Sequence, residues 1–268
     1  MKVAILTIVV VLVVLVSIIT DCTTKDSYLV KIMKLAPEDT NIVLCMDTEA
    51  IAEDPDFGPI YDATISSLGH ETASIDRSAI SAFASIDTDR YYILIFIGDF
   101  DLEDIRDALI EEDYIDDEYR GVEIWTGDFE HTIAFIDNMI VSSYTTDSVE
   151  ACILIHKNEE PSMYDNEDMK AVADKLLSGV IRMVFGPDYT DDIEILAGGL
   201  CWRNLNRDDE VLDYTGWYKF DSEASAEAAM AEDFEDDMRT ELDAASIDAR
   251  LSGQFIEITG EMEIPEYW

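Results

Sequence analysis

The sequence predicts an α+β fold, with mainly antiparallel sheets, helices packed on one face and two related halves that each contain a β-α-β-β unit. Three observations predict it. Apolar runs of strand length recur along the 268 residues, amphipathic helical segments separate some of them, and the order strand, helix, strand, strand occurs twice. Helices gathered on one face of an antiparallel sheet are the usual α+β arrangement.

The first half is expected to span residues 28–157. Its clearest helix places Leu102, Ile105 and Leu109 on one face with acidic residues opposite, and residues 114–120 are expected to form an acidic loop. The predicted strands are residues 41–47, 79–86, 91–98, 122–125, 132–137 and 139–144, and the predicted helices are residues 60–68, 102–112 and 147–156.

The second half is expected to span residues 158–268. Glu159, Glu160 and Pro161 lie in the polar stretch that favours a boundary between the halves. The predicted helices are residues 166–177 and 222–242, and the predicted strands are residues 180–185, 193–203, 211–221, 247–251 and 254–262.

An internal duplication is the interpretation we favour for the repeated order of elements. The residues match only locally, where FDLE from Phe100 is followed 120 positions later by FDSE from Phe220. The alternative is that β-α-β-β order recurs by chance, as it does in many α+β proteins.

The N-terminus predicts export. Residues 3–19 are almost wholly apolar behind Lys2, a length between a signal peptide and a spanning helix. Residues 1–21 are therefore a signal peptide or a membrane anchor, followed by a tether at residues 22–27. Cys22 is a candidate lipidation site, although Asp21 stands where a lipobox has a small residue. Both alternatives place the folded part outside the cytoplasm, anchored to the cell membrane by the N-terminal segment or by a lipid on Cys22.

These features together resemble a family of exported or membrane-anchored prokaryotic proteins with repeated β-α-β-β units. The resemblance rests on the leader, the loop LAPEDT before the first strand, the turn DPDFGP and the paired units. It implies a two-repeat α+β fold and implies no activity.

The charge of the chain limits its partners. Sixty acidic residues against 17 basic ones give a formal net charge of −43. Nucleic acid and anionic membrane surfaces are disfavoured, because binding to phosphates needs clustered Lys and Arg. Three explanations stay open: adaptation to high salt, which screens the repulsion between acids, bound divalent cations, or a docking surface for a protein or cationic ligand. The acids are spread along the whole chain, which favours the first.

No familiar catalytic motif occurs in the sequence. It has no GxSxG, HExxH, P-loop or GxGxxG, and no CxxC pair. Cys45, Cys152 and Cys201 lie in apolar runs and are interpreted as buried thiols, with one disulfide among them as the alternative.

The densest acidic group lies where a strand meets a helix. Asp99, Asp101 and Asp104 are candidate ligands of a divalent cation there, calcium being the one considered, while capping of the helix explains the same residues without a metal. No other cofactor is predicted, and no catalytic residue is assigned.

We therefore expect an exported, membrane-tethered acidic protein that acts by binding or as an envelope component, without enzymatic activity and adapted to high salt. The alternatives are a carboxylate-dependent hydrolase and a calcium-binding surface module.

Overall fold

The structure, a computed structural model, describes residues 27–53, 57, 75–176, 179–189, 194–206, 211–232 and 234–263. The helices are α2 (Tyr28–Met33), α3 (Thr48–Glu53), α5 (Leu102–Glu111), α6 (Thr146–His156), α7 (Glu167–Ala173), α8 (Glu223–Ala231) and α9 (Phe234–Glu241). The strands are β1 (Thr40–Asp47), β2 (Ile80–Thr88), β3 (Tyr92–Gly98), β4 (Ile115–Tyr119), β5 (Val122–Thr126), β6 (Thr132–Ile136), β7 (Met139–Ser143), β8 (Ile181–Phe185), β9 (Ala197–Asn206), β10 (Val211–Lys219), β11 (Ala244–Ser252) and β12 (Phe255–Glu263).

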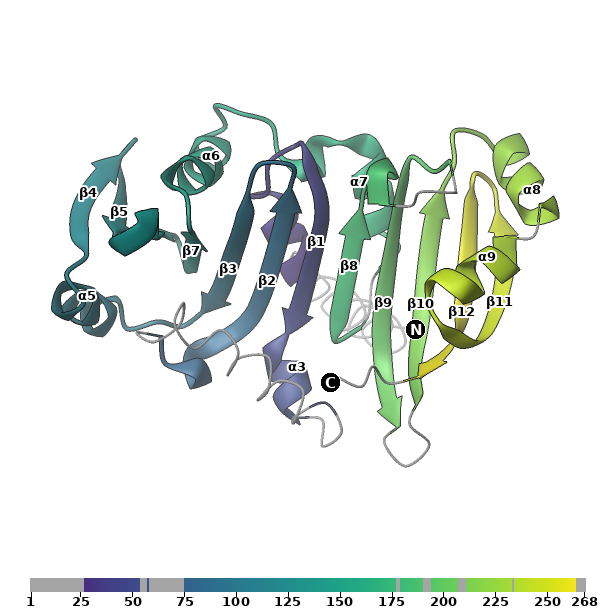
Figure 1. The fold of residues 1–268 in the computed structure, drawn as a ribbon, viewed down its shortest axis with the longest axis horizontal. Coiled ribbons are helices and arrows are strands. Elements are labelled where there is room, and N and C mark those ends of the chain that lie inside the picture. The colour runs from purple at the N-terminus through teal and green to yellow at the C-terminus, as the bar shows by residue number, and fades with distance from the viewer. Residues whose placement is uncertain are drawn as a thin grey trace, which may run out of the picture.

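The described strands form one 12-stranded sheet with the order β11-β12-β10-β9-β8-β1-β2-β3-β7-β6-β5-β4 (Figure 1). Every neighbouring pair is antiparallel. The α+β class, with antiparallel strands and helices packed on them, is therefore confirmed. The predicted leader at residues 1–21, the turn DPDFGP apart from Phe57, the helix at residues 60–68 and nearly all of the tether lie outside the described residues.

Alternating side chains give the sheet two buried faces. On β3, Ile93 and Ile95 belong to one apolar cluster, whereas Leu94 and Phe96 belong to the other. Helices α2, α6 and α7 pack on the first face, and helices α3, α5, α8 and α9 pack on the second. The helices are thus divided between two faces, since the central strands are apolar on both sides. Each fully buried Ile or Leu contributes about 1.5–3 kcal/mol to the stability of these layers.

The two halves share one sheet and follow a similar path. Strand β1 pairs with β8, and this contact joins them. From that junction outward, β1-β2-β3 corresponds to β8-β9-β10, and the third strand then pairs with the last strand of its half, β7 or β12. The hairpin β6-β7 therefore occupies the place of β11-β12, and β4-β5 is an addition to the first half. The shared strand order is the one a duplication would give, and the duplication itself stays a prediction.

Four elements differ from the expectations, and one of them is helix α3, since no helix was predicted at Thr48–Glu53. Residues 114–120 contain edge strand β4, whose exposed acids are typical of an edge protected against further pairing. The helix expected at 222–242 is two helices, and in the second of them Phe234 and Met238 are buried. Helix α2 was not expected, because its six residues are too few to show a helical period.

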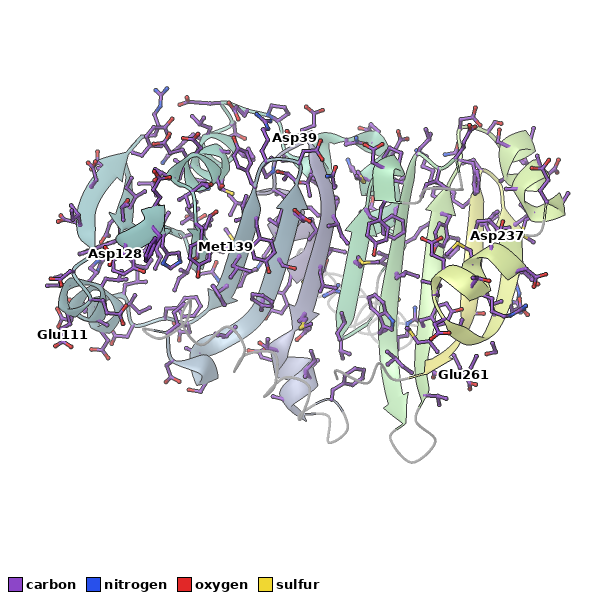
Figure 2. All side chains as sticks on the ribbon, viewed as in Figure 1. Asp39, Glu111, Asp128, Met139, Asp237 and Glu261 are labelled. Carbon is purple, nitrogen blue, oxygen red and sulfur yellow. The ribbon has the colours of Figure 1, made fainter. Side chains whose placement is uncertain are left out.

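Acidic side chains lie on well-separated parts of the surface. The exposed acids Asp39, Glu111, Asp128, Asp237 and Glu261, labelled in Figure 2, come from both halves and both ends of the sheet. This distribution agrees with the even spread of acids along the sequence. It gives most of the surface the same sign of charge, so a place where basic residues gather is unusual in this protein.

Candidate ligand-binding cleft

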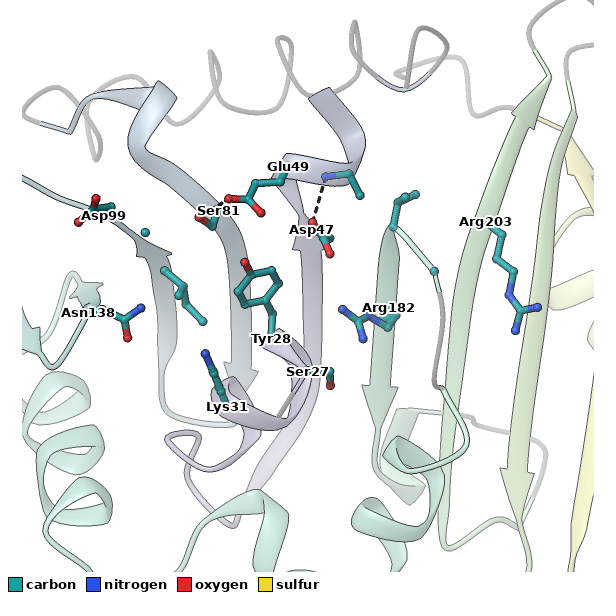
Figure 3. A pocket seen from close by; sticks show the side chains of 15 residues that line it. Ser27, Tyr28, Lys31, Asp47, Glu49, Ser81, Asp99, Asn138, Arg182 and Arg203 are labelled. Carbon is teal, nitrogen blue, oxygen red and sulfur yellow. Dashed lines mark hydrogen bonds between the residues drawn. The ribbon is translucent and has the colours of Figure 1, made fainter. Parts of the chain in front are cut away.

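Such a gathering occurs in a cleft of about 1000 Å³ near the centre of the sheet, which we call the Arg182 cleft (Figure 3). Its lining includes Tyr28 and Lys31 from α2, Asp47 from the end of β1, and Arg182 from β8. Further lining residues used below are Glu49, Ser81, Gly98, Asp99 and Arg203. Both halves of the chain thus contribute to the cleft, through the β1–β8 pairing.

The passage from β1 into α3 positions two acids at the cleft. Asp47 ends the strand, and its Oδ1 accepts a hydrogen bond of 3.0 Å from the backbone N–H of Ala50 at the start of the helix. The Thr48 hydroxyl donates to the carbonyl of Ile80 at 2.6 Å, which ties the turn to β2. Glu49 follows immediately, and its Oε1 accepts from the Ser81 hydroxyl at 2.9 Å. Each carboxylate keeps one oxygen uncommitted in these contacts.

A close approach of two strands places a third acid beside the cleft. A Cβ on Gly98 would lie 2.0 Å from the carbonyl oxygen of Ala79, so only glycine fits at this point. The next residue, Asp99, donates its backbone N–H to the same carbonyl at 3.1 Å. The exposed carboxylate of Asp99 is thereby held at the rim.

Arg182 is the unusual residue of the cleft. It lies directly opposite Cys45 on β1 and Cys201 on β9, and only 4% of it is exposed. Its Nε has no hydrogen-bond partner, and no hydrogen bond or ion pair joins its guanidinium to any residue in the described parts of the chain. Figure 3 shows the side chain extending toward Tyr28 and the interior of the cleft. A buried positive charge thus lines the cleft.

Two neighbouring groups stay neutral around this charge. Burial raises the pKa of the Cys45 thiol to about 12, although Arg182 acts in the opposite direction. Burial also raises the pKa of the Tyr28 hydroxyl, and the negative charge of Glu49 adds to the effect. At neutral pH Tyr28 is therefore a hydrogen-bond donor within the cleft.

The cysteines are buried free thiols. Cys45, Cys152 and Cys201 are all unpaired. Strand β8, which carries Arg182, lies between the strands of Cys45 and Cys201. The two cysteines are therefore two strand spacings apart, roughly 9–10 Å. That separation exceeds the roughly 7 Å limit between Cα atoms for a disulfide.

The three candidate metal ligands have different surroundings. Asp99 lies at the cleft, whereas Asp101 caps α5 by accepting from the backbone N–H groups of Glu103 at 3.0 Å and Asp104 at 3.4 Å. Asp104 is exposed in the first turn of that helix. Where the structure describes the chain, no group of three or more His, Cys, Asp or Glu is arranged to hold a metal ion. The lipidation candidate Cys22 lies outside the described residues.

A second polar cluster, around His131, is satisfied internally. The His131 ring is buried, with Nδ1 2.5 Å from the Tyr114 hydroxyl and Nε2 2.8 Å from the Ser142 hydroxyl. Burial lowers its pKa below the ordinary value. Both ring nitrogens therefore have partners, which indicates a structural role.

Sequence reasoning missed Arg182. The residue interrupts an apolar run, VIRMVF, and a lone arginine in a predicted buried strand was the available signal. Its burial depends on strands β1 and β9, and the pairing with β1, which lies in the other half, has no local sequence signature.

Comparison with known proteins gives limited help. No family model matches the chain, and no curated protein matches it. One solved structure, described as crystal form IV of TP0453, aligns with a TM-score of 0.49 and 9% identity, over 86% of this chain and 92% of that one. Among the helices that the structure describes, none is both long and apolar enough to cross a membrane.

Proposed function

We propose that the protein is an exported, membrane-tethered binding protein without catalytic activity, whose Arg182 cleft takes a small solute bearing a carboxylate group. One observation carries the proposal, namely that Arg182 is 4% exposed and its guanidinium has no partner in the described parts of the chain. Export is supported by the apolar leader and the family resemblance. Adaptation to high salt is supported by the excess of acidic residues in the sequence.

The energetic reason is the cost of an unpaired buried charge. Leaving a buried ion without its partner costs on the order of 3–5 kcal/mol, which is a large share of a domain's stability. A guanidinium matches a carboxylate through two parallel N–H···O bonds. A bound carboxylate would offset the free-energy cost of the buried guanidinium. The hydrogen bonds of Arg182 would then be satisfied only when the ligand is bound.

Binding without catalysis agrees with the chemistry of the surroundings. Burial raises the pKa of the Cys45 thiol, opposite Arg182, to about 12, so this thiol is protonated at neutral pH. Asp47 and Glu49 each hold a local hydrogen bond that fixes their position. Carboxylates held in fixed positions near a buried guanidinium suit the recognition of a charged solute.

The test is isothermal titration calorimetry of the full-length chain in detergent, in molar potassium chloride, with N-acetyl-L-alanine and L-alanine as carboxylate probes. We expect saturable binding of at least one probe, lost in Arg182→Leu and weakened in Arg182→Lys. Arg250→Leu is the matched control, because Arg250 is exposed and its guanidinium pairs with Asp248 on the surface. Equal binding by wild type and Arg182→Leu would contradict the proposal.

A further inference from the structure

Among the lining residues that the structure describes, the Arg182 cleft carries charges of both signs in equal number. Its basic residues are Lys31, Arg182 and Arg203, and its acidic residues are Asp47, Glu49 and Asp99. The whole chain has 17 basic against 60 acidic residues, so this balance is far from the average of the protein. Arg203 has an interaction of its own, so Arg182 and Lys31 are the cations considered as ligand contacts.

The two signs come from different elements. Figure 3 shows Asp47 and Glu49 beside α3, Lys31 on α2, and Arg182 on β8, with the Tyr28 ring among them. A ligand in the cleft therefore meets acceptor oxygens from one direction and donors from another. A molecule with only a negative charge would be attracted by Arg182 and repelled by the neighbouring carboxylates.

From these charges we infer that the ligand is a zwitterion with a primary ammonium group and a carboxylate, as in a free amino acid or a short peptide. This inference rests on the proposed function and narrows the class of solute. The carboxylate binds at Arg182 and Lys31, and the ammonium binds at the oxygens of Asp47 and Glu49 that have no hydrogen bond within the described residues.

The field of the whole protein favours a neutral ligand. A chain with a formal net charge of −43 repels anions as they approach, whereas a zwitterion has no net charge to repel. High salt screens the distant charges and leaves the short-range pairs inside the cleft less affected. Selection between an anion and a zwitterion is therefore made within the cleft itself.

The groups present suit a primary ammonium and not a quaternary one. Quaternary ammonium ions are bound in cages of several aromatic rings. Tyr28 is the one aromatic residue among the lining residues that the structure describes. A primary ammonium has three N–H donors, and the acceptors it needs are supplied by the second oxygens of Asp47 and Glu49.

The size of the cleft leaves room beyond one amino acid. Its volume of about 1000 Å³ is at the upper end of the usual range for small-molecule sites. The same charge recognition therefore serves a free amino acid with any side chain or a peptide of a few residues. The two sources share the ammonium and carboxylate and differ in the distance between them.

A matched panel of probes separates the contributions. Calorimetry of the full-length chain in detergent and molar potassium chloride would use L-alanine, di-L-alanine and tri-L-alanine as zwitterions. N-acetyl-L-alanine keeps the carboxylate without the ammonium, and L-alanine amide keeps the ammonium without the carboxylate. We expect at least one zwitterion to bind tenfold or more tightly than either single-charge probe, and the preferred length identifies amino acid or peptide.

The acid variants test the ammonium site without removing its local hydrogen bonds. Asp47→Asn keeps an oxygen for the N–H of Ala50, and Glu49→Gln keeps one for the Ser81 hydroxyl. Each is expected to weaken zwitterion binding about tenfold and leave N-acetyl-L-alanine binding unchanged or tighter. Asp248→Asn, at an exposed pair on edge strand β11, is the control and should change nothing. Thermal unfolding of each variant checks that it is folded.

Two failures are distinguishable. If N-acetyl-L-alanine binds as tightly as L-alanine and its peptides, through Arg182, the zwitterion inference is wrong and the proposed carboxylate site stands. If no carboxylate probe binds, or if Arg182→Leu has no effect on binding, both the inference and the proposed function are wrong.

Discussion

Two buried cations on the same face of the sheet differ in what they contact. Lys219 on β10 is 8% exposed and donates to the Asp168 carboxylate of α7 at 2.6 Å. Arg182 on β8 is 4% exposed and has no such partner in the described residues. The Lys219 pair closes a contact between helix and sheet, so it belongs to the fold. Arg182 is a buried charge whose cost no contact in the described residues offsets, which is why the proposed ligand is placed there.

The largest effect is expected where the internal pair is broken. Asp168→Ala leaves Lys219 buried without its carboxylate and should cost about 3 kcal/mol, the lower end for breaking a buried pair, because the Asp168 side chain is 37% exposed. Urea unfolding measures the loss. Glu167→Ala is the control, since Glu167 lies in the same first turn of α7 and is exposed. A similar loss in both variants would assign the effect to the helix and not to the pair.

Substitution of Arg182 is expected to raise the free energy of unfolding, in contrast to Asp168→Ala. Arg182→Leu replaces an unpaired buried charge by an apolar side chain and should stabilise the ligand-free protein by about 2 kcal/mol. Arg250→Leu, at an exposed pair, should change stability by less than about 0.5 kcal/mol. Urea unfolding without added solute compares them. Destabilisation by Arg182→Leu would show that the guanidinium supports the fold, and the contrast with Lys219 would fail.

A third buried polar group, His131, extends the comparison to a neutral side chain with two partners. His131→Leu leaves the buried Ser142 hydroxyl without that bond and should cost about 1–2 kcal/mol at pH 7.5. Because burial lowers the pKa of His131, the folded protein keeps the ring neutral while the unfolded chain takes up a proton near pH 6.5. This contribution to stability is complete above that pH and is lost as pH falls toward the folded-state pKa. The difference between wild type and His131→Leu should therefore shrink from pH 7.5 to pH 5. A constant difference would contradict the assignment.

The same contrast explains which features the sequence could predict. Strands β2 and β3 were expected within about two residues of their bounds, because their apolar runs are local and a polar turn separates them. Edge strand β4 was not predicted, because a run of acidic residues is typical of a loop. Its hydrogen-bonded pairing with β5 makes it a strand. The candidate metal ligands Asp99, Asp101 and Asp104 could be recognised because they lie close together in the sequence. Arg182 lines the same cleft as Asp47 and Lys31 because β1 pairs with β8 across more than a hundred residues, and no local pattern encodes that pairing.

The smallest effect is expected at Asp101. This carboxylate binds backbone groups of its own helix, whereas the acids of the cleft are proposed to bind a ligand. Because Asp101 accepts from two N–H groups at the start of α5, Asp101→Ala should cost about 1 kcal/mol and Asp101→Asn much less, since asparagine caps equally well. Thermal unfolding in potassium chloride and in millimolar calcium at matched ionic strength decides between cap and metal ligand. If Asp101 acts as a cap, both salts stabilise wild type alike and the cost of Asp101→Ala is the same in each. If calcium raises the unfolding temperature of wild type more than potassium chloride does, and Asp101→Asn abolishes that difference, then Asp101 is a metal ligand.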